Sequence, residues 1–143
     1  MLKTLLKLLS PKTRIIRVKY RRKGGLGGAD AHYKAHKEFA RTLVHQKLTS
    51  FNLHYKFTYN KVAIRNQRSR WGSCSKRGNL NFHYRIVLLP EHLQDYLIVH
   101  ELCHLEMFNH SKNFWALVAE TIPDHAARRK ELIAHGRKQH STP

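Results

Sequence analysis

The chain has 143 residues, of which 41% are hydrophobic and 25% are charged, so the composition excludes a disordered chain and predicts one globular domain with a modest core. It carries 27 lysines and arginines against 9 acids, a formal net charge of +18. The two cysteines, Cys74 and Cys103, are too few for a disulfide framework. With no secretory signal ahead of the domain, we expect a cytoplasmic protein.

The chain begins with leucines interrupted by lysines. The leucines at positions 2, 5, 6 and 9 fall on one helical face, which suits a weak basic amphipathic anchor or a short helix that packs on its own domain. The segment is too short and too charged to cross a bilayer, so we expect no transmembrane segment.

Most of the positive charge lies in the first ninety residues, where Asp30 and Glu38 are the only acids. A field of this size attracts polyanions, so nucleic acid or a ribosome is a candidate partner, with solubility as the alternative explanation. No helix-turn-helix or zinc-finger pattern supports base-specific reading. The residues that we expect to contact nucleic acid are Arg17, Lys19, Arg21, Arg22 and Lys23.

The N-terminal region is predicted to be an arm. Residues 14–20 favour a first strand or edge arm, and the glycine-rich residues 23–28 favour a hinge. We therefore divide the chain into a basic arm or short strand, residues 1–28, and a domain, residues 29–143.

A first helix is predicted from an Asp30 cap to about Leu48. Its spacing predicts Ala35, Phe39, Leu43 and Leu48 on the inner face. The outer face would carry Lys34, Lys37, Arg41 and Lys47.

Residues 56–89 have the pattern of strands, at 61–65, 69–75 and 79–88, with a turn at 76–78. This order predicts an antiparallel meander that leads into a helix beginning near Pro90. That helix has no glycine or proline from Leu93 to Met107, and Asn109 suits a left-handed stop.

Two more helices are predicted after it. Ser111 can cap a helix from Lys112 to about Thr121. Pro123 and Asp124 can open a last helix that Gly136 ends.

The helix after Pro90 carries the pattern HExxH. His100 and His104 are four residues apart, so both can direct an imidazole nitrogen at one metal ion. Glu101 can reach a water on the metal rather than the metal itself. With His110 as a third ligand, Zn²⁺ would keep one open position, as in a catalytic site.

Other interpretations of these residues remain open. The histidines could have a core or capping role, and Glu120 or Glu131 could replace His110 as the third ligand. The spacing from His104 to His110 equals that of metzincins, but Met107 stands where those proteins have a turn-making glycine. Cys103 is expected to pack in the interior, with a redox switch or metal ligation as the alternative.

The block around Trp71 is the second motif. An edge strand here could pair with an extended peptide, and Gly72 would let another backbone come close. Alternatively, Trp71 is a core anchor and Cys74 a small buried residue. The residues that we expect to bind substrate are Arg68, Trp71, Gly72 and Ser73.

Three blocks in this order resemble the YgjP-like zinc metallopeptidase domain, a relative of the SprT-like proteases. They are RNQRSRWGSCS at 65–75, HELCH at 100–104 and NHSKNFW at 109–115. The resemblance covers residues 55–122 closely and the first helix loosely. It implies an α+β fold, a minimal zincin, with a small antiparallel sheet packed beside the HExxH active-site helix and flanking helices.

By this resemblance His100, His104 and His110 hold one Zn²⁺ ion and Glu101 is the general base of a peptidase that cleaves proteins or peptides, possibly ones held on nucleic acid. Candidates to stabilise the oxyanion are Arg68, His83 and Tyr84. The alternative is a basic module that binds nucleic acid or a ribosome and has a structural zinc.

Overall fold

A computed structural model describes residues 28–140 of the chain. The expected strand at 14–20, the basic residues 17–23 and most of the expected arm lie outside the described residues. The elements are the helices α2 (Gly28–Tyr55), α3 (Glu91–Cys103), α4 (Lys112–Ala119) and α5 (His125–His140), the strands β1 (Lys61–Arg65), β2 (Gly72–Cys74) and β3 (Asn79–His83), and the 3-10 helix η2 (Tyr84–Leu88).

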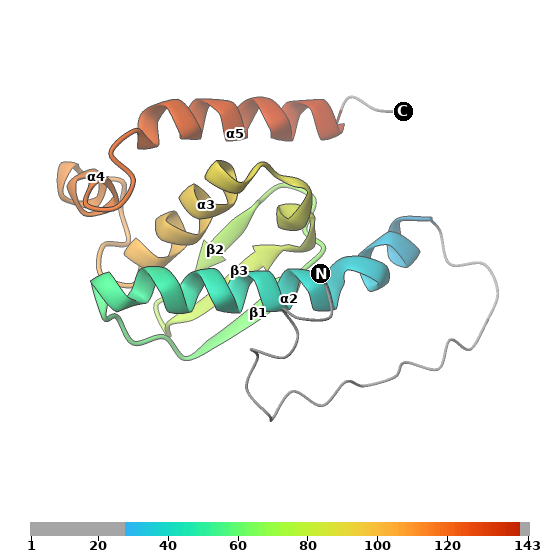
Figure 1. Cartoon of the computed structure of the whole chain (residues 1–143), viewed down its shortest axis with the longest axis horizontal. Coiled ribbons are helices and arrows are strands. Elements are labelled where there is room, and N and C mark those ends of the chain that lie inside the picture. Colours follow the sequence, from blue (N-terminus) through green and yellow to red (C-terminus); the bar gives the residue numbers. More distant parts are fainter. Residues whose placement is uncertain (1–27, 141–143) are drawn as a thin grey trace, which may run out of the picture.

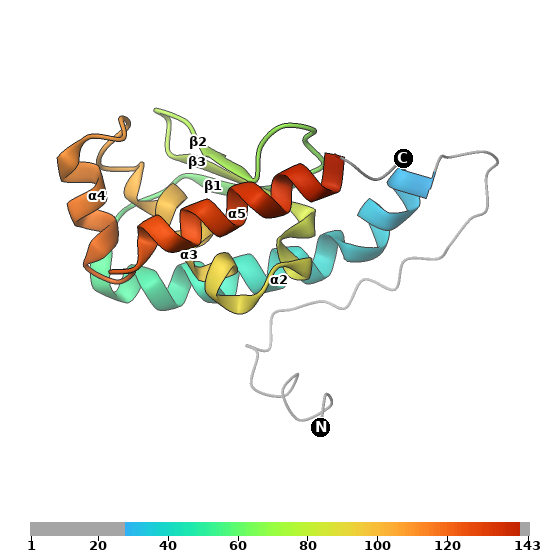
Figure 2. The same cartoon turned by 90° about the horizontal axis from the view of Figure 1, so that it is seen from above.

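Helix α3 lies at the centre of the domain. Figure 1 shows it between α2 and α5, with the sheet behind, and Figure 2 shows from above that the sheet lies on one side of it and α2 on the other. Helix α3 contacts α2, α4, α5 and strand β2. No helix in the described part of the chain is long and apolar enough to cross a membrane.

Helix α2 is longer than predicted and has a different buried face. Its fully buried residues are Ala40, Val44 and Leu48, at helical spacing, whereas Phe39 is 61% exposed. Ala35 is also exposed, so the prediction that Ala35 and Phe39 point inward was wrong. The reason is that the apolar stripe continues from Val44 toward Tyr55, which packs in the core.

The end of α2 is set by Lys56, which has a positive φ of 56°. Its N–H donates to the carbonyl of Asn52 at 2.8 Å, a left-handed helix cap of the kind that glycine usually forms. The Asn52 side chain holds the next residue as well, because it exchanges two hydrogen bonds with the backbone of Phe57.

The sheet is mixed, with the strand order β1-β3-β2. Strand β3 lies in the middle, antiparallel to β2 but parallel to β1. The predicted antiparallel meander was therefore wrong for β1. The long connection from Arg65 to Gly72 takes the chain past the position of β3. Strand β2 therefore lies on the other side of β3 from β1, at the edge of the sheet beside α3.

The predicted strand at 79–88 ends at His83 and continues as η2. The imidazole Nδ1 of His83 accepts a hydrogen bond from the Arg85 backbone N–H, which caps the 3-10 turn. Tyr84 and Ile86 of this turn are buried in the core. A local side-chain cap has replaced the second half of the strand.

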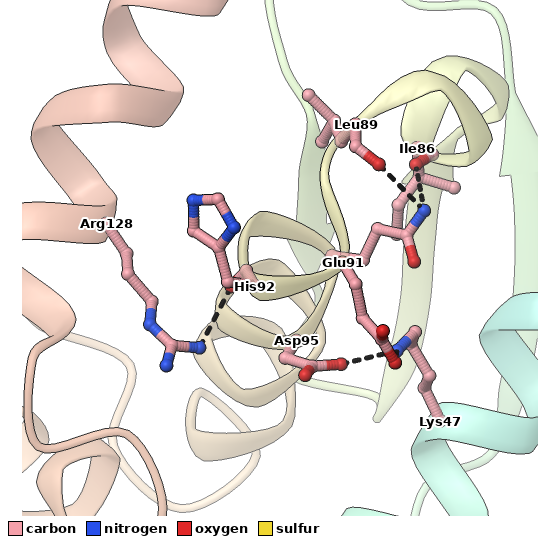
Figure 3. Close-up of polar contacts among 8 residues, drawn as sticks. Lys47, Ile86, Leu89, Glu91, His92, Asp95 and Arg128 are labelled. Carbon is pink, nitrogen blue, oxygen red and sulfur yellow. Dashed lines mark hydrogen bonds and ion pairs between the residues drawn. The ribbon is translucent and has the colours of Figure 1, made fainter.

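The first turn of α3 is fixed on three sides (Figure 3). The buried amide of Gln94 donates to the carbonyl oxygens of Ile86 and Leu89, which joins α3 to η2. Lys47 of α2 forms ion pairs with Asp95 and Glu91. The guanidinium of Arg128 on α5 donates to the carbonyl oxygen of His92.

Helix α3 starts at Glu91, next to the predicted start near Pro90, but ends at Cys103, before the predicted stop at Asn109. Its last turn tightens, because the N–H groups of Leu105 and Glu106 bond three residues back. Among the described residues, Lys56 is the only one other than glycine that has a positive φ. The expected left-handed stop at Asn109 is therefore absent.

The last two helices begin close to their predicted starts. Ser111 caps α4, and its hydroxyl accepts from the Phe114 N–H, as expected. Helix α5 begins at His125 but runs past Gly136, which was predicted to end it. A Cβ at Gly136 would lie 3.4 Å from the indole nitrogen of Trp71, so this glycine lets the helix approach that ring closely.

Candidate active site

Three histidines converge where α3 meets the loop that leads to α4. The Nε2 atoms of His100 and His104 are 3.1 Å apart, and each lies 3.2 Å from Nε2 of His110. His100 and His104 come from one face of the helix. The turn after Cys103 brings His110 back to them.

The other ring nitrogen of each helical histidine is engaged. Nδ1 of His104 lies 2.9 Å from the carbonyl oxygen of Met107, so it donates there and its Nε2 keeps a free electron pair. Nδ1 of His100 lies 3.2 Å from the hydroxyl of Tyr96, one helical turn earlier. Such partners fix both the orientation and the tautomer of a metal-binding imidazole.

Aromatic rings enclose the cluster on the α4 side. The ring of Phe114 stacks on His104 with centroids 4.4 Å apart. Trp115 stacks on His110 at 5.7 Å, and its ring also stacks on His125 at 5.1 Å. His110 is exposed and lies in a loop, and the rings of Phe114, with centroids 5.1 Å apart, and of Trp115 hold its ring in place.

The donor set fits a tetrahedral metal ion. Three nitrogens bound to Zn²⁺ would lie about 3.3 Å from one another, close to the observed separations. Burial, followed by the charges of His104 and His110, lowers the pKa of His100 to about 3, which keeps its imidazole neutral. Neutral imidazoles whose electron pairs meet at one point can hold a metal cation.

Glu101 lies beside this cluster and is 5% exposed. Burial raises its pKa to about 8, and the positive charge of Arg70 opposes that shift. Strand β2 packs directly against it at Gly72, where a Cβ would come within 3.0 Å of the Glu101 Oε1 atom.

Two adjoining cavities expose these side chains to solvent. One, of about 290 Å³, lies between α3 and α5, and the other, of about 270 Å³, lies beside β2. Both are lined by Arg70, Gly72, His100, Glu101 and His110. We call them together the histidine cleft.

Sequence comparison matches residues 16–135 to the family model described as YgjP-like, metallopeptidase domain. The chain belongs to the YgjP-like metallopeptidase family. This membership and the fold make it a zinc metallopeptidase, and the resemblance noted in its motifs is confirmed. No curated protein matches the chain.

Two solved structures share the fold of this YgjP-like domain. The metallopeptidase zymogen abylysin of Pyrococcus abyssi is 23% identical, with a TM-score of 0.59 over 64% of this chain and 93% of its own. The metallopeptidase zymogen jannalysin of Methanocaldococcus jannaschii is 22% identical, with a TM-score of 0.52 over 67% of this chain and 95% of its own. The predicted α+β fold of a minimal zincin is thereby confirmed.

The residues expected to bind substrate separate into two groups in the YgjP-like domain. Trp71, Gly72 and Ser73 line the histidine cleft. Trp71 also packs against the core. Its ring therefore lies at the boundary between the core and the cleft. Arg68 instead lines a neighbouring cavity.

The candidates for the oxyanion lie away from the histidine cleft. His83 and Arg68 line the neighbouring cavity, and the Tyr84 hydroxyl is buried against His32 and Arg85. Two arginines that sequence reasoning missed, Arg70 and Arg129, line the cleft instead. The position of Arg70 next to Trp71 was a usable signal, whereas Arg129 reaches the cleft only because α5 crosses α3.

The alternative ligands are engaged elsewhere. Glu120 binds His54 and Glu131 binds His92, each with an oxygen 2.8 Å from the imidazole nitrogen. Cys103 is fully buried in the core. Cys74 is half-buried and lines the histidine cleft, where burial and then the charge of Glu101 raise its pKa to about 11.

Proposed function

We propose that the protein is a peptidase in which one Zn²⁺ ion is held by His100, His104 and His110 and Glu101 is the general base. The convergence of three Nε2 atoms within 3.2 Å of one another, beside a buried carboxyl group, is the observation that carries this proposal. A closed structural site would need a fourth protein ligand, and among residues 28–140 only these three residues form such a group.

Glu101 is suited to proton transfer. Its burial raises the pKa to about 8, near the pH at which a base that accepts and returns a proton works best. Glu101 takes the proton of the attacking water and then delivers it to the amine of the leaving peptide. A bound zinc ion supplies the Lewis acidity that polarises the peptide carbonyl and acidifies water.

An extended peptide would lie along β2. This strand is at the edge of the sheet in the described part of the chain, and its residues Gly72, Ser73 and Cys74 line the histidine cleft. Its free backbone groups can pair with a substrate strand, which would place a peptide bond beside Glu101.

Arg70 and Arg129 would stabilise the negative charge that develops on the carbonyl oxygen. Arg70 lies near enough to Glu101 to influence its pKa, and Arg129 acts likewise on His100. Both arginines are exposed, and their positive charges beside the cleft are suitable partners for an oxyanion. They replace the three candidates named from the sequence.

The decisive experiment is Glu101→Gln, which removes the base and preserves the shape of the side chain. The variant is expected to bind zinc in a 1:1 ratio and to lose cleavage of casein or of an unfolded protein by at least about 100-fold. Full proteolytic activity in this variant would show that Glu101 is not the base.

A matched control is Glu106→Gln, which changes an exposed acid just after the same helix. It lies outside the histidine cleft and is expected to retain both zinc and activity. Loss of activity in both variants would indicate a general effect of charge rather than catalysis.

As a second property, we propose that the protein binds nucleic acid. It is supported by the net charge of +18 and its concentration in the first ninety residues. Fluorescence anisotropy with a labelled single-stranded oligonucleotide at rising salt tests it. Binding that is absent at 50 mM salt would contradict it.

A further inference from the structure

We propose that a second cavity, next to the histidine cleft, binds a carboxylate of the peptide substrate and so gives the enzyme a preference for acidic peptides. The inference rests on the proposed peptidase function. The cavity has a volume of about 250 Å³ and lies between the loop before β2, the start of η2 and helix α5. We call it the arginine pocket; its lining residues are Asn66, Gln67, Arg68, Ser69, Arg70, Trp71, His83, Arg85 and Gly136.

The arginine pocket has three positive side chains and no acid in its lining. Within residues 28–140, no ion pair engages Arg68 or Arg70. Residues 1–27 and 141–143 contain no aspartate or glutamate, so no acidic side chain there can supply the opposite charge. Three guanidinium groups around one cavity repel one another, and a bound anion would relieve that repulsion.

His83 holds the wall of this pocket in place. Its backbone N–H donates to the carbonyl oxygen of Trp71 at 2.7 Å, and its imidazole Nδ1 accepts from the Arg85 backbone N–H at 3.0 Å. The rings of His83 and Trp71 also meet edge to face, with centroids 5.6 Å apart. The end of the loop that carries Arg68 and Arg70 is therefore attached to the sheet at Trp71 through a backbone hydrogen bond and a ring contact.

The third arginine is positioned by a neighbouring ring. Nε of Arg85 donates to the Tyr84 hydroxyl at 3.0 Å, and Tyr84 is buried in the core. Arg85 is half-buried and lines the pocket. The planar fork of arginine matches the two oxygens of a carboxylate.

The arginine pocket is continuous with the place where cleavage would occur. Arg70 and Trp71 line both this pocket and the part of the histidine cleft that contains His100 and Glu101. A peptide bound at Glu101 can therefore extend past Trp71 and place a charged group among the arginines. This shared wall favours an acid on the substrate over an unrelated polyanion.

Two parts of a peptide carry the required carboxylate: an aspartate or glutamate side chain, or the C-terminus of the chain. A panel of quenched fluorescent decapeptides separates them. One arm has capped ends and a single glutamate moved through each position, each peptide being compared with its glutamine counterpart. The other arm compares a free C-terminus with its amide at successive distances from the cleaved bond.

The wild-type zinc enzyme is expected to show, at one position, kcat/KM about fivefold or more higher for the acidic peptide. Arg68→Ala should lower this ratio toward one, and Arg68→Glu should make a lysine at that position the better choice. Arg77→Ala is the matched control: Arg77 is exposed in the turn between β2 and β3, outside the arginine pocket, and its loss should leave the ratio unchanged.

Binding gives a readout that does not depend on turnover. Anisotropy of the best labelled acidic peptide is measured on Glu101→Gln and on the double variant that also carries Arg68→Ala. The double variant is expected to bind about fivefold more weakly, whereas adding Arg77→Ala should have no effect.

The outcomes separate the two proposals. If the enzyme cleaves efficiently but the ratio of kcat/KM between acidic and neutral peptides is near one at every position, the proposed carboxylate pocket is wrong and the proposed peptidase function is still supported. No cleavage of any peptide or protein by the zinc enzyme overturns both. If Arg68→Ala weakens the binding of a single-stranded oligonucleotide but keeps the peptide ratio, the pocket serves nucleic acid and the proposal is wrong.

Discussion

Gly72 of strand β2 lies directly against Glu101 of helix α3: a Cβ at position 72 would be 2.9 Å from the Cγ atom of Glu101 and 3.0 Å from the carbonyl oxygen of Asn81. Real Cβ atoms do not approach other atoms so closely. The two motifs, one around Trp71 and one around His100, are therefore in contact through a position that only glycine can occupy. The glycine lets the edge strand reach the buried carboxyl group.

We expect Gly72→Ala to displace Glu101, because the carbonyl of Asn81 belongs to the central strand and cannot yield. Overpacking of this kind costs about 1–3 kcal/mol, and a shifted base loses its alignment with the peptide bond. The expected result is a kcat lower by about tenfold or more with zinc still bound 1:1. Gly28→Ala is the control, since a Cβ there meets no atom within 4 Å. Equal activity of the two variants would contradict the close packing.

Trp115 is predicted to position His110 rather than to touch substrate. Its ring stacks on both His110 and His125. Trp115→Ala should weaken zinc binding by about tenfold or more, the usual effect of losing a group that orients a metal ligand. Competition with a zinc chelator measures this. Trp115→Phe keeps a ring against His110 and should restore most of the affinity; a Phe variant as weak as Ala would show that stacking is not the cause.

Gln94 is predicted to contribute to the stability of the fold without taking part in catalysis. Its buried amide donates to the carbonyls of Ile86 and Leu89 at 3.1 and 3.0 Å. Gln94→Leu keeps the bulk but removes both donors, so we expect a loss of about 1–3 kcal/mol in the free energy of unfolding, measured in urea. Gln46→Leu, at an exposed position on α2, should change it by less than about 0.5 kcal/mol. A similar loss in the free energy of unfolding for both variants would contradict a stabilising role of these two hydrogen bonds.

The stability of the protein kept free of metal by a chelator should depend on the protonation of Glu101. Its pKa is raised from 4.5 to about 8 on folding, so between pH 8 and 6.5 the folded chain takes up a proton that the unfolded chain does not. The free energy of unfolding therefore rises as the pH falls from 8 to 6.5, by at most about 2 kcal/mol. Thermal unfolding across this range measures it.

Below pH 6.5 the histidines act in the opposite direction. Burial lowers the pKa of His100 to about 3 and also lowers the pKa values of His104 and His83, so the unfolded chain takes up protons on these imidazoles first and the fold loses stability as the pH falls further. Glu101→Gln removes the rise between pH 8 and 6.5 and makes the loss of stability below pH 6.5 steeper, because Glu101 favours the folded state down to about pH 4.5. If that variant shows the same rise as the wild type, another group is responsible.

Much of the site could be read from the sequence because it is local. His100, Glu101 and His104 stand on one helix, and the spacing of an α-helix alone places the two imidazoles together. Ser111 was identifiable as a cap for the same reason. Errors arose where a long-range contact decided the outcome, as at Phe39, whose spacing fits an inward face but which lies outside the packed stripe.

The sequence by itself determined the family, the helix with its two histidines and glutamate, and the neighbouring tryptophan block, because short-range periodicity and motif order carry that information. Tertiary structure alone decided that β1 runs parallel to β3, that Gly72 touches Glu101 and that Arg70 and Arg129 line the cleft. These relationships depend on the crossing of α5 over α3 and on the path of the loop before β2. Both are set by the packing of residues far apart in the chain, which no local spacing encodes.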